Sequence, residues 1–121
     1  MTQERIDGYA EWSRDFNPLH VNPVFAAQSP FGGTIAHGML VLGIVGGALA
    51  ANYGERWLKG GRLRARFREP VRPGDVLTIR CEPKGPARGA ADREQGFAII
   101  VTNQRNVTVV DCQGAIFAVR V

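Results

Sequence analysis

The spacing of hydrophobic and polar residues divides the chain into a helical front and an alternating second half. Apolar positions in residues 2–14 fall at helical spacing, which predicts a short amphipathic helix. Two Asn-Pro pairs follow, and proline disfavours helix in the residue before it, so residues 15–23 are predicted to form an irregular, stiffened loop. Proline suits a first helical position, which predicts a short helix over residues 23–28, and a loop is expected over residues 29–33.

A long uncharged stretch comes next, because residues 35–53 contain no Asp, Glu, Lys or Arg. Its length alone would allow a membrane span, but its many glycines and alanines, and the strand-like sequence after it, favour a buried helix. We expect a helix over about residues 35–52, with Thr34 as its N-cap and Gly54 as its end. Since it is apolar on all sides, other elements should enclose it, and its glycines should let a sheet or a substrate approach closely.

Beyond this helix, hydrophobic and polar residues alternate, which is the period of a strand. Arginine at every second position of residues 62–68 predicts a strand with one dry face and one cationic face. Later strands are predicted over residues 75–81, 97–102 and 107–119, the last as one strand or a pair with a bulge at Gly114. Turns and loops are predicted between them, at residues 70–74, 83–96 and 103–106. This order predicts an α+β fold, in which an antiparallel sheet of about four strands wraps a central helix.

Composition indicates one ordinary globular domain over residues 1–121, with 45% hydrophobic and 21% charged residues. The two cysteines, Cys81 and Cys112, have no metal-binding spacing, so we interpret them as free thiols of a cytoplasmic protein without a zinc site. No basic segment followed by an apolar one opens the chain, so no secretion signal is expected.

The formal net charge of +4 suits acidic partners, such as phosphate-bearing substrates. A solvated basic surface is the simpler explanation of charge alone. Nucleic acid is not expected as a partner, because no nucleic-acid motif is present and the aromatic residues are not interleaved with the basic ones. A membrane is not expected as a partner either.

Asp15 and His20 form an acid–imidazole pair on the predicted loop. A carboxylate beside a histidine can orient the ring and fix its tautomer, and the pair could hold a water and move its proton. The alternative is a surface acid and histidine that cap turns, and the spacing alone favours that alternative.

His37 and Gly38 lie at the start of the predicted long helix. Free N–H groups there can stabilise negative charge on an oxygen, and Gly38 has no side chain to keep a carbonyl away. His37 itself is interpreted as a residue that caps its own helix. Metal ligation by Asp15, His20 and His37 is not expected, because they follow no recognised ligand spacing. No serine nucleophile, phosphate loop or dinucleotide motif stands out.

Two segments resemble a known family. They read YAEWSRDFNPLHVNP from Tyr9 and FGGTIAHGML from Phe31. Together they closely resemble the hydratase motif of MaoC-like proteins, the (R)-specific enoyl-CoA hydratases and (3R)-hydroxyacyl-ACP dehydratases. The resemblance is strong from Tyr9 to Ala50 and general in pattern up to Val121. It implies the hot-dog fold and a hydro-lyase that reversibly adds water, in syn fashion, to 2-enoyl thioesters.

The resemblance assigns roles residue by residue. The catalytic Asp and His of the family fall on Asp15 and His20, with a water held between them. Asn17 falls on the Asn that helps to shape the loop, and His37 supports the motif. Gly38 falls on the glycine whose N–H binds the thioester carbonyl.

The resemblance also implies cofactors and partners. Neither a metal nor a redox cofactor is expected, since CoA or acyl-carrier-protein thioester is the substrate. A homodimer is expected, or a heterodimer with another hot-dog subunit. The cationic residues of the first strand are candidate contacts for phosphates of CoA or for an acidic carrier protein, with a solvated sheet face as the alternative: Arg62, Arg64 and Arg66.

Two departures from the family pattern affect these expectations. The family's usual first N-terminal strand is predicted to be missing, and Gly46 stands where some members carry a serine, which should widen the pocket. Two other functions stay open: a hot-dog acyl-thioesterase, and a non-catalytic subunit that binds acyl thioesters. The acyl chain, the carrier, the direction of reaction and the pathway are not specified by the sequence.

Overall fold

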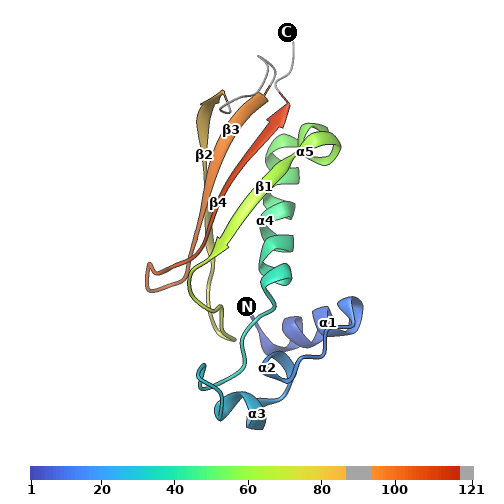
Figure 1. The fold of residues 1–121 in the computed structure, drawn as a ribbon, viewed down its shortest axis with the longest axis vertical. Helices are drawn as coiled ribbons and strands as arrows, with labels where there is room; N and C mark the ends of the chain where they lie inside the picture. Colours follow the sequence, from blue (N-terminus) through green and yellow to red (C-terminus); the bar gives the residue numbers. More distant parts are fainter. Residues whose placement is uncertain (87–93, 118–121) are drawn as a thin grey trace.

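The computed structural model describes residues 1–86 and 94–117 of the chain. Three short helices form the front, a long helix and a short one follow, and four strands complete the fold (Figure 1). The helices are α1 (Gln3–Ser13), α2 (Pro18–Val21), α3 (Pro23–Ala27), α4 (Gly38–Tyr53) and α5 (Glu55–Gly60). The strands are β1 (Arg62–Phe67), β2 (Thr78–Pro86), β3 (Glu94–Thr102) and β4 (Thr108–Phe117).

The strands form one antiparallel sheet in the order β1-β4-β3-β2. Helix α4 lies along one face of this sheet, and α1, α2 and α3 gather at the end where α4 begins (Figure 1). This arrangement confirms the predicted α+β fold with an antiparallel sheet and a central helix. Among the described residues, no strand precedes α1.

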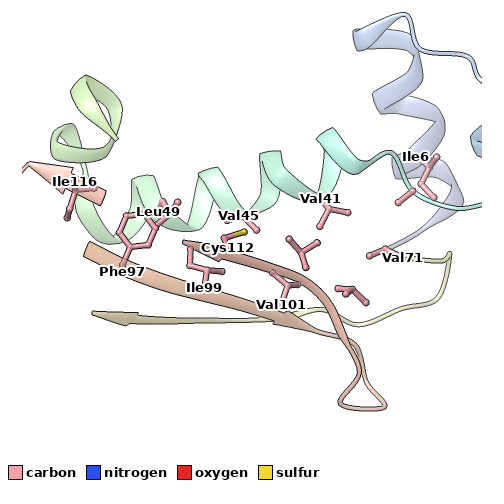
Figure 2. Packing of buried hydrophobic residues seen from close by; sticks show 13 residues of the cluster. Ile6, Val41, Val45, Leu49, Val71, Phe97, Ile99, Val101, Cys112 and Ile116 are labelled. Atoms are coloured by element: carbon pink, nitrogen blue, oxygen red, sulfur yellow. The ribbon is translucent and has the colours of Figure 1, made fainter. Parts of the chain in front are cut away.

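The core lies between α4 and the sheet. Val41, Val45 and Leu49, spaced four residues apart, form the buried row of α4 and pack toward the sheet (Figure 2). Facing them are buried residues of β3, among them Phe97 and Ile99. Each aliphatic or aromatic side chain buried in this way contributes about 1.5–3 kcal/mol through the hydrophobic effect.

The opposite side of α4 is open in the described residues of the single chain, so within one chain the sheet encloses this helix on one side only. Met39 is 63% exposed, and a β-carbon added to Gly43, Gly46 or Gly47 would meet nothing within 4 Å. These glycines therefore do not serve a close approach of the sheet. A helix can be apolar all round and still bury only one row of side chains within its own chain.

The predicted start of α4 is wrong by several residues. The hydroxyl of Thr34 donates to Gln3 Oε1 at 2.6 Å and does not cap the helix. The next residues form extended chain, because the N–H of Ile35 donates to Leu19 and the N–H of Ala36 donates to Val71. These tertiary bonds hold residues 34–36 outside the helix, and α4 begins at Gly38.

The predicted irregular loop of residues 15–23 contains a helical turn, α2, which carries His20. Asn17 accepts a hydrogen bond from the N–H of Leu19 through its side chain, and Pro18 occupies the first turn. An Asn-Pro pair can therefore start a helix as well as stop one, since Asn is a strong N-cap and Pro suits the first helical position. The short helix predicted from Pro23 is confirmed as α3.

The sheet differs from the prediction in three places. Asp75 precedes the strand and is buried in a turn, where its carboxylate accepts from the N–H of Arg72 and from the side chain of Gln104. Strands β2 and β3 extend into the predicted loop over residues 83–96, of which 87–93 lie outside the described residues. Gly114 is in regular register with β1 and β3 and is not a bulge. Glycine is needed there because an added β-carbon would lie 2.3 Å from the carbonyl oxygen of Arg62.

Both cysteines are free thiols, as predicted. Burial raises the pKa of Cys112 to about 11. The hydroxyl of Tyr53 lies 3.4 Å from Cys81 Sγ, and this hydrogen bond, with burial, raises the pKa of Tyr53 to about 12. None of the helices in the described parts of the chain has the length and apolar character needed to cross a membrane.

Candidate active site

Asp15 lies on the short link between α1 and α2. The preceding residue, Arg14, ends α1 in the left-handed conformation with φ of 61°. The N–H of Asp15 donates to Ser13 Oγ at 3.2 Å, and its carboxylate accepts from the N–H of Asn17 at 3.2 Å. Because residues 14–17 are all exposed, local hydrogen bonds rather than burial shape this link.

His20 is held by hydrogen bonds from two directions. Its Nδ1 lies 2.8 Å from the carbonyl oxygen of Ile35, and the side chain of Gln3 donates to the carbonyl of His20 at 2.8 Å. A carbonyl oxygen can only accept, so Nδ1 of His20 carries the proton of the neutral ring. Its Nε2 then offers a lone pair, as a general base requires.

His37 occupies the N-cap position of α4, but its side chain does not cap the helix, so our interpretation of that side chain is wrong. Its side chain makes no capping bond, and its Nε2 instead lies 2.9 Å from the backbone carbonyl oxygen of Asp15. The His37 ring stacks on the His20 ring with 3.9 Å between their centroids. The Tyr9 ring meets the His37 ring edge-on, with 4.8 Å between those centroids. His37 is 2% exposed, and its Nδ1 has no hydrogen-bond partner among the described residues.

These contacts bring Asp15, His20 and His37 together. One ligand-type atom from each side chain lies within 4.8 Å of the other two. A single water with hydrogen bonds of about 2.8 Å can bridge atoms at that separation. The same three residues are the one group of potential metal ligands among the described residues, although a ring nitrogen of each histidine is already engaged by a backbone carbonyl.

Gly38 begins α4, so its N–H has no acceptor within the helix. Gly38 and His20 both line a cavity of about 310 Å³, whose walls are mainly apolar side chains, among them Phe31, Val41 and Phe67. An added β-carbon on Gly38 would lie 2.9 Å from Cζ of Phe67. The cavity thus joins a basic imidazole, a free helix-start N–H and an apolar chamber.

The predicted phosphate contacts do not line this cavity. Arg62 pairs with Glu94 on the sheet, while Arg64 and Arg66 are exposed and have no charged partner among the described residues. The charged residues that line it are instead Arg68, whose Nε is paired with Asp111 at 2.5 Å, and Glu69.

The sequence reasoning missed several residues of the site. Phe67 and Arg68 belong to the alternating arginine pattern, and their position at the end of that strand was the available signal. Tyr9 is the first residue of the resembling segment, and that was its signal. Gln3 carried none, because an amide on an amphipathic helix is an ordinary surface residue.

The chain is similar in sequence and in fold to known proteins. A family model described as MaoC like domain matches residues 1–107. The 3-hydroxybutyryl-CoA dehydratase of Methylorubrum extorquens is 36% identical over 77 residues, which cover 64% of this chain and 49% of that protein. The chain thus spans about half the length of that relative.

Two solved structures share the fold over nearly the whole chain. The unliganded R-hydratase from Pseudomonas aeruginosa is 30% identical with a TM-score of 0.77, covering 98% of this chain and 74% of that one. The (R)-hydratase from A. caviae is 27% identical with a TM-score of 0.77, covering 99% and 89%. The expected hot-dog fold is confirmed.

Proposed function

This chain belongs to the MaoC-like domain family, and we propose that it reversibly hydrates 2-enoyl thioesters to (3R)-hydroxyacyl thioesters. The observation that carries the proposal is the pairing of Asp15 with His20. Their side chains lie close enough to share one water, and the hydrogen bond to Ile35 leaves Nε2 of His20 free to accept a proton.

In the hydration direction, His20 Nε2 takes a proton from the water held between the two side chains. The water oxygen forms a bond to C3 of the enoyl group, and Asp15, as the acid of the pair, delivers a proton to C2 on the same face. A proton then returns from His20 to Asp15 before the next turnover. General acid–base catalysis of this kind contributes about 10²–10⁴-fold in rate.

Gly38 stabilises the negative charge that develops on the thioester oxygen when C3 is attacked. Its N–H is free at the start of the 16-residue helix α4, where the helix dipole adds to the hydrogen bond. The apolar cavity beside it receives the rest of the reacting group. Because Gly38 and His20 line the same cavity, both can face one bound thioester.

The carrier of the thioester is CoA or an acyl-carrier protein, both of which bear phosphate. Arg64 and Arg66 supply exposed cations on β1, the strand that ends beside the cavity at Phe67. Arg62 contributes less, because Glu94 neutralises it. No step of the proposed reaction requires a metal or a redox cofactor.

The active form is a homodimer, with a heterodimer of two hot-dog subunits as the alternative. Both edge strands of the described sheet, β1 and β2, have one unpaired side, and α4 leaves Met39 exposed close to the site. Edge pairing with a second subunit would cover such groups. Light scattering of the purified chain should give the mass of two copies.

The experiment that tests the function follows two signals with crotonyl-CoA and longer 2-enoyl-CoA substrates. Loss of the enoyl absorbance without release of free thiol, with a (3R) product by chiral chromatography, is the expected result. Release of free thiol would indicate a thioesterase instead. Neither signal from a folded dimer would indicate a non-catalytic subunit.

A further inference from the structure

We propose that His37 is a positioning residue, which holds the backbone of Asp15 and the ring of His20, and that the two stacked imidazoles carry their protons on opposite nitrogens. The catalytic part of this inference rests on the proposed hydratase activity. The protonation pattern does not, so it can be measured even in a protein without activity.

The proton of each neutral ring is fixed by a carbonyl oxygen. His20 faces the carbonyl of Ile35 with Nδ1 at 2.8 Å, and His37 faces the carbonyl of Asp15 with Nε2 at 2.9 Å. Since neither oxygen can donate, the proton must lie on Nδ1 of His20 and on Nε2 of His37.

The surroundings of His37 exclude the other arrangement. If its proton were on Nδ1, a buried N–H would lack an acceptor, and the lone pair of Nε2 would point at the oxygen of Asp15. An orphaned buried donor is rarer and costlier than an orphaned acceptor. With the proton on Nε2, only an acceptor atom stays unpaired.

The ring of His37 is also fixed in place. It is 2% exposed, with the His20 ring stacked at 3.9 Å and the ring of Tyr9 in edge contact at 4.8 Å. A ring held between two others cannot turn without displacing one of them. His37 can therefore define the plane in which His20 presents its free nitrogen.

Asp15 has few other anchors. It follows a left-handed residue on an exposed link, and its other hydrogen bonds to described residues reach only two positions along the chain. The bond from His37 is the contact that ties this link to the start of α4, 22 residues away. Without it, the carboxylate and the imidazole would no longer share one water reliably.

Two substitutions separate the hydrogen bond from the ring stacking. In His37→Gln a side-chain N–H can still reach the Asp15 carbonyl, whereas His37→Phe keeps a flat ring but has no donor. We expect His37→Phe to lower kcat about 100-fold with KM changed less than about threefold, the scale of a catalytic group misplaced by about 1 Å. His37→Gln should recover at least about tenfold of that loss.

A purely structural His37 would give a different result: both variants would lose activity in proportion to their loss of folded protein. Equal kcat in the two variants, or full activity in His37→Phe, would overturn the positioning role.

A measurement on the unaltered protein covers the case in which neither variant folds. The sequence contains only two histidines, so a long-range ¹H–¹⁵N NMR spectrum at about pH 8, above the ordinary histidine range, resolves both rings. We expect the Nδ1–H pattern for His20 and the Nε2–H pattern for His37, assigned with His20→Ala. The same tautomer in both rings, or exchange between tautomers in either, would overturn the inference. Absence of hydratase activity beside the expected spectrum would refute the proposed function alone.

Discussion

The ring of Phe67 packs directly against the α-carbon of Gly38, so closely that a β-carbon on Gly38 would lie 2.9 Å from Cζ and 3.0 Å from Cε1 of that ring. This contact joins the end of β1 to the first residue of α4. It places an aromatic wall of the cavity beside the N–H proposed to bind the thioester oxygen.

Gly38→Ala should therefore impair catalysis without unfolding the protein. Phe67 is 54% exposed, so its ring can move aside, but the new methyl group and the shift of the ring change the wall of the cavity beside the N–H of residue 38. We expect kcat/KM to fall about 100-fold, the scale seen on loss of one oxyanion donor, while far-UV circular dichroism stays unchanged. The double variant Gly38→Ala with Phe67→Ala should recover part of the loss. A double variant as slow as the single one would show that the contact with Phe67 is not the cause.

Two glycines should respond in opposite ways to alanine. Gly8 lies exposed within α1 with nothing within 4 Å of an added β-carbon, so Gly8→Ala should raise the free energy of unfolding by up to about 1 kcal/mol.

Gly114→Ala would place a methyl group 2.3 Å from the Arg62 carbonyl oxygen and 2.5 Å from the ring of the buried Phe97. It should lower the free energy of unfolding by about 1–3 kcal/mol or more, the usual cost of overpacking. Urea denaturation of both variants measures the difference. Equal midpoints would contradict the packing described around Gly114.

The buried thiol of Cys112 should make the fold less stable at alkaline pH. Burial raises its pKa from 9.0 to about 11, so the unfolded chain loses this proton at a lower pH than the native one. The stabilisation that the Cys112 thiol adds to the folded state is complete below pH 9. It declines as the pH rises toward 11.

Cys112→Ala should remove that decline, although Tyr53, with its pKa raised to about 12, still contributes a loss of the same sign at higher pH. Urea denaturation of the wild type and of Cys112→Ala, at several pH values between 9 and 11, tests the prediction. Parallel pH profiles would contradict it.

Charge reversal at the exposed arginines of β1 should weaken binding of the carrier. We expect Arg64→Glu with Arg66→Glu to raise KM for an enoyl-CoA about tenfold at low salt, and the difference to shrink as salt screens the charges. Arg80→Glu supplies a control with half that charge change, at an exposed arginine of β2 that pairs with Glu82 at 3.9 Å. A short thioester without phosphate should show no change in KM. An unchanged KM for the CoA substrate at low salt would refute the role of this face.

Local pattern was sufficient for the helix–strand order and the alternating arginine strand, whereas the role of the acid–imidazole pair came from the family resemblance and not from its spacing. Local pattern failed where distant contacts decide. The Asn17–Pro18 pair was interpreted as a helix stop, yet the same two residues start α2, because Asn caps and Pro suits the first turn. Thr34 has the side chain of an N-cap, but Gln3 from α1 takes its hydroxyl.

The site shows the same division between local and tertiary information. The resemblance singled out Asp15, His20 and Gly38, and the structure brings all three to one end of α4. The contact of His37 with Asp15 spans 22 residues and depends on how α1 and α2 pack against the start of α4. No spacing along the chain contains that information, so His37 was interpreted as a local cap.

The most direct test of the whole account is hydration of crotonyl-CoA by the wild-type protein beside Asp15→Asn and His20→Ala, followed by the loss of enoyl absorbance. We expect activity in the wild type and a fall of about 10²–10⁴-fold in kcat for each substitution, with both variants folded. Wild-type hydration that survives either substitution would contradict the assignment of Asp15 and His20 as the catalytic pair.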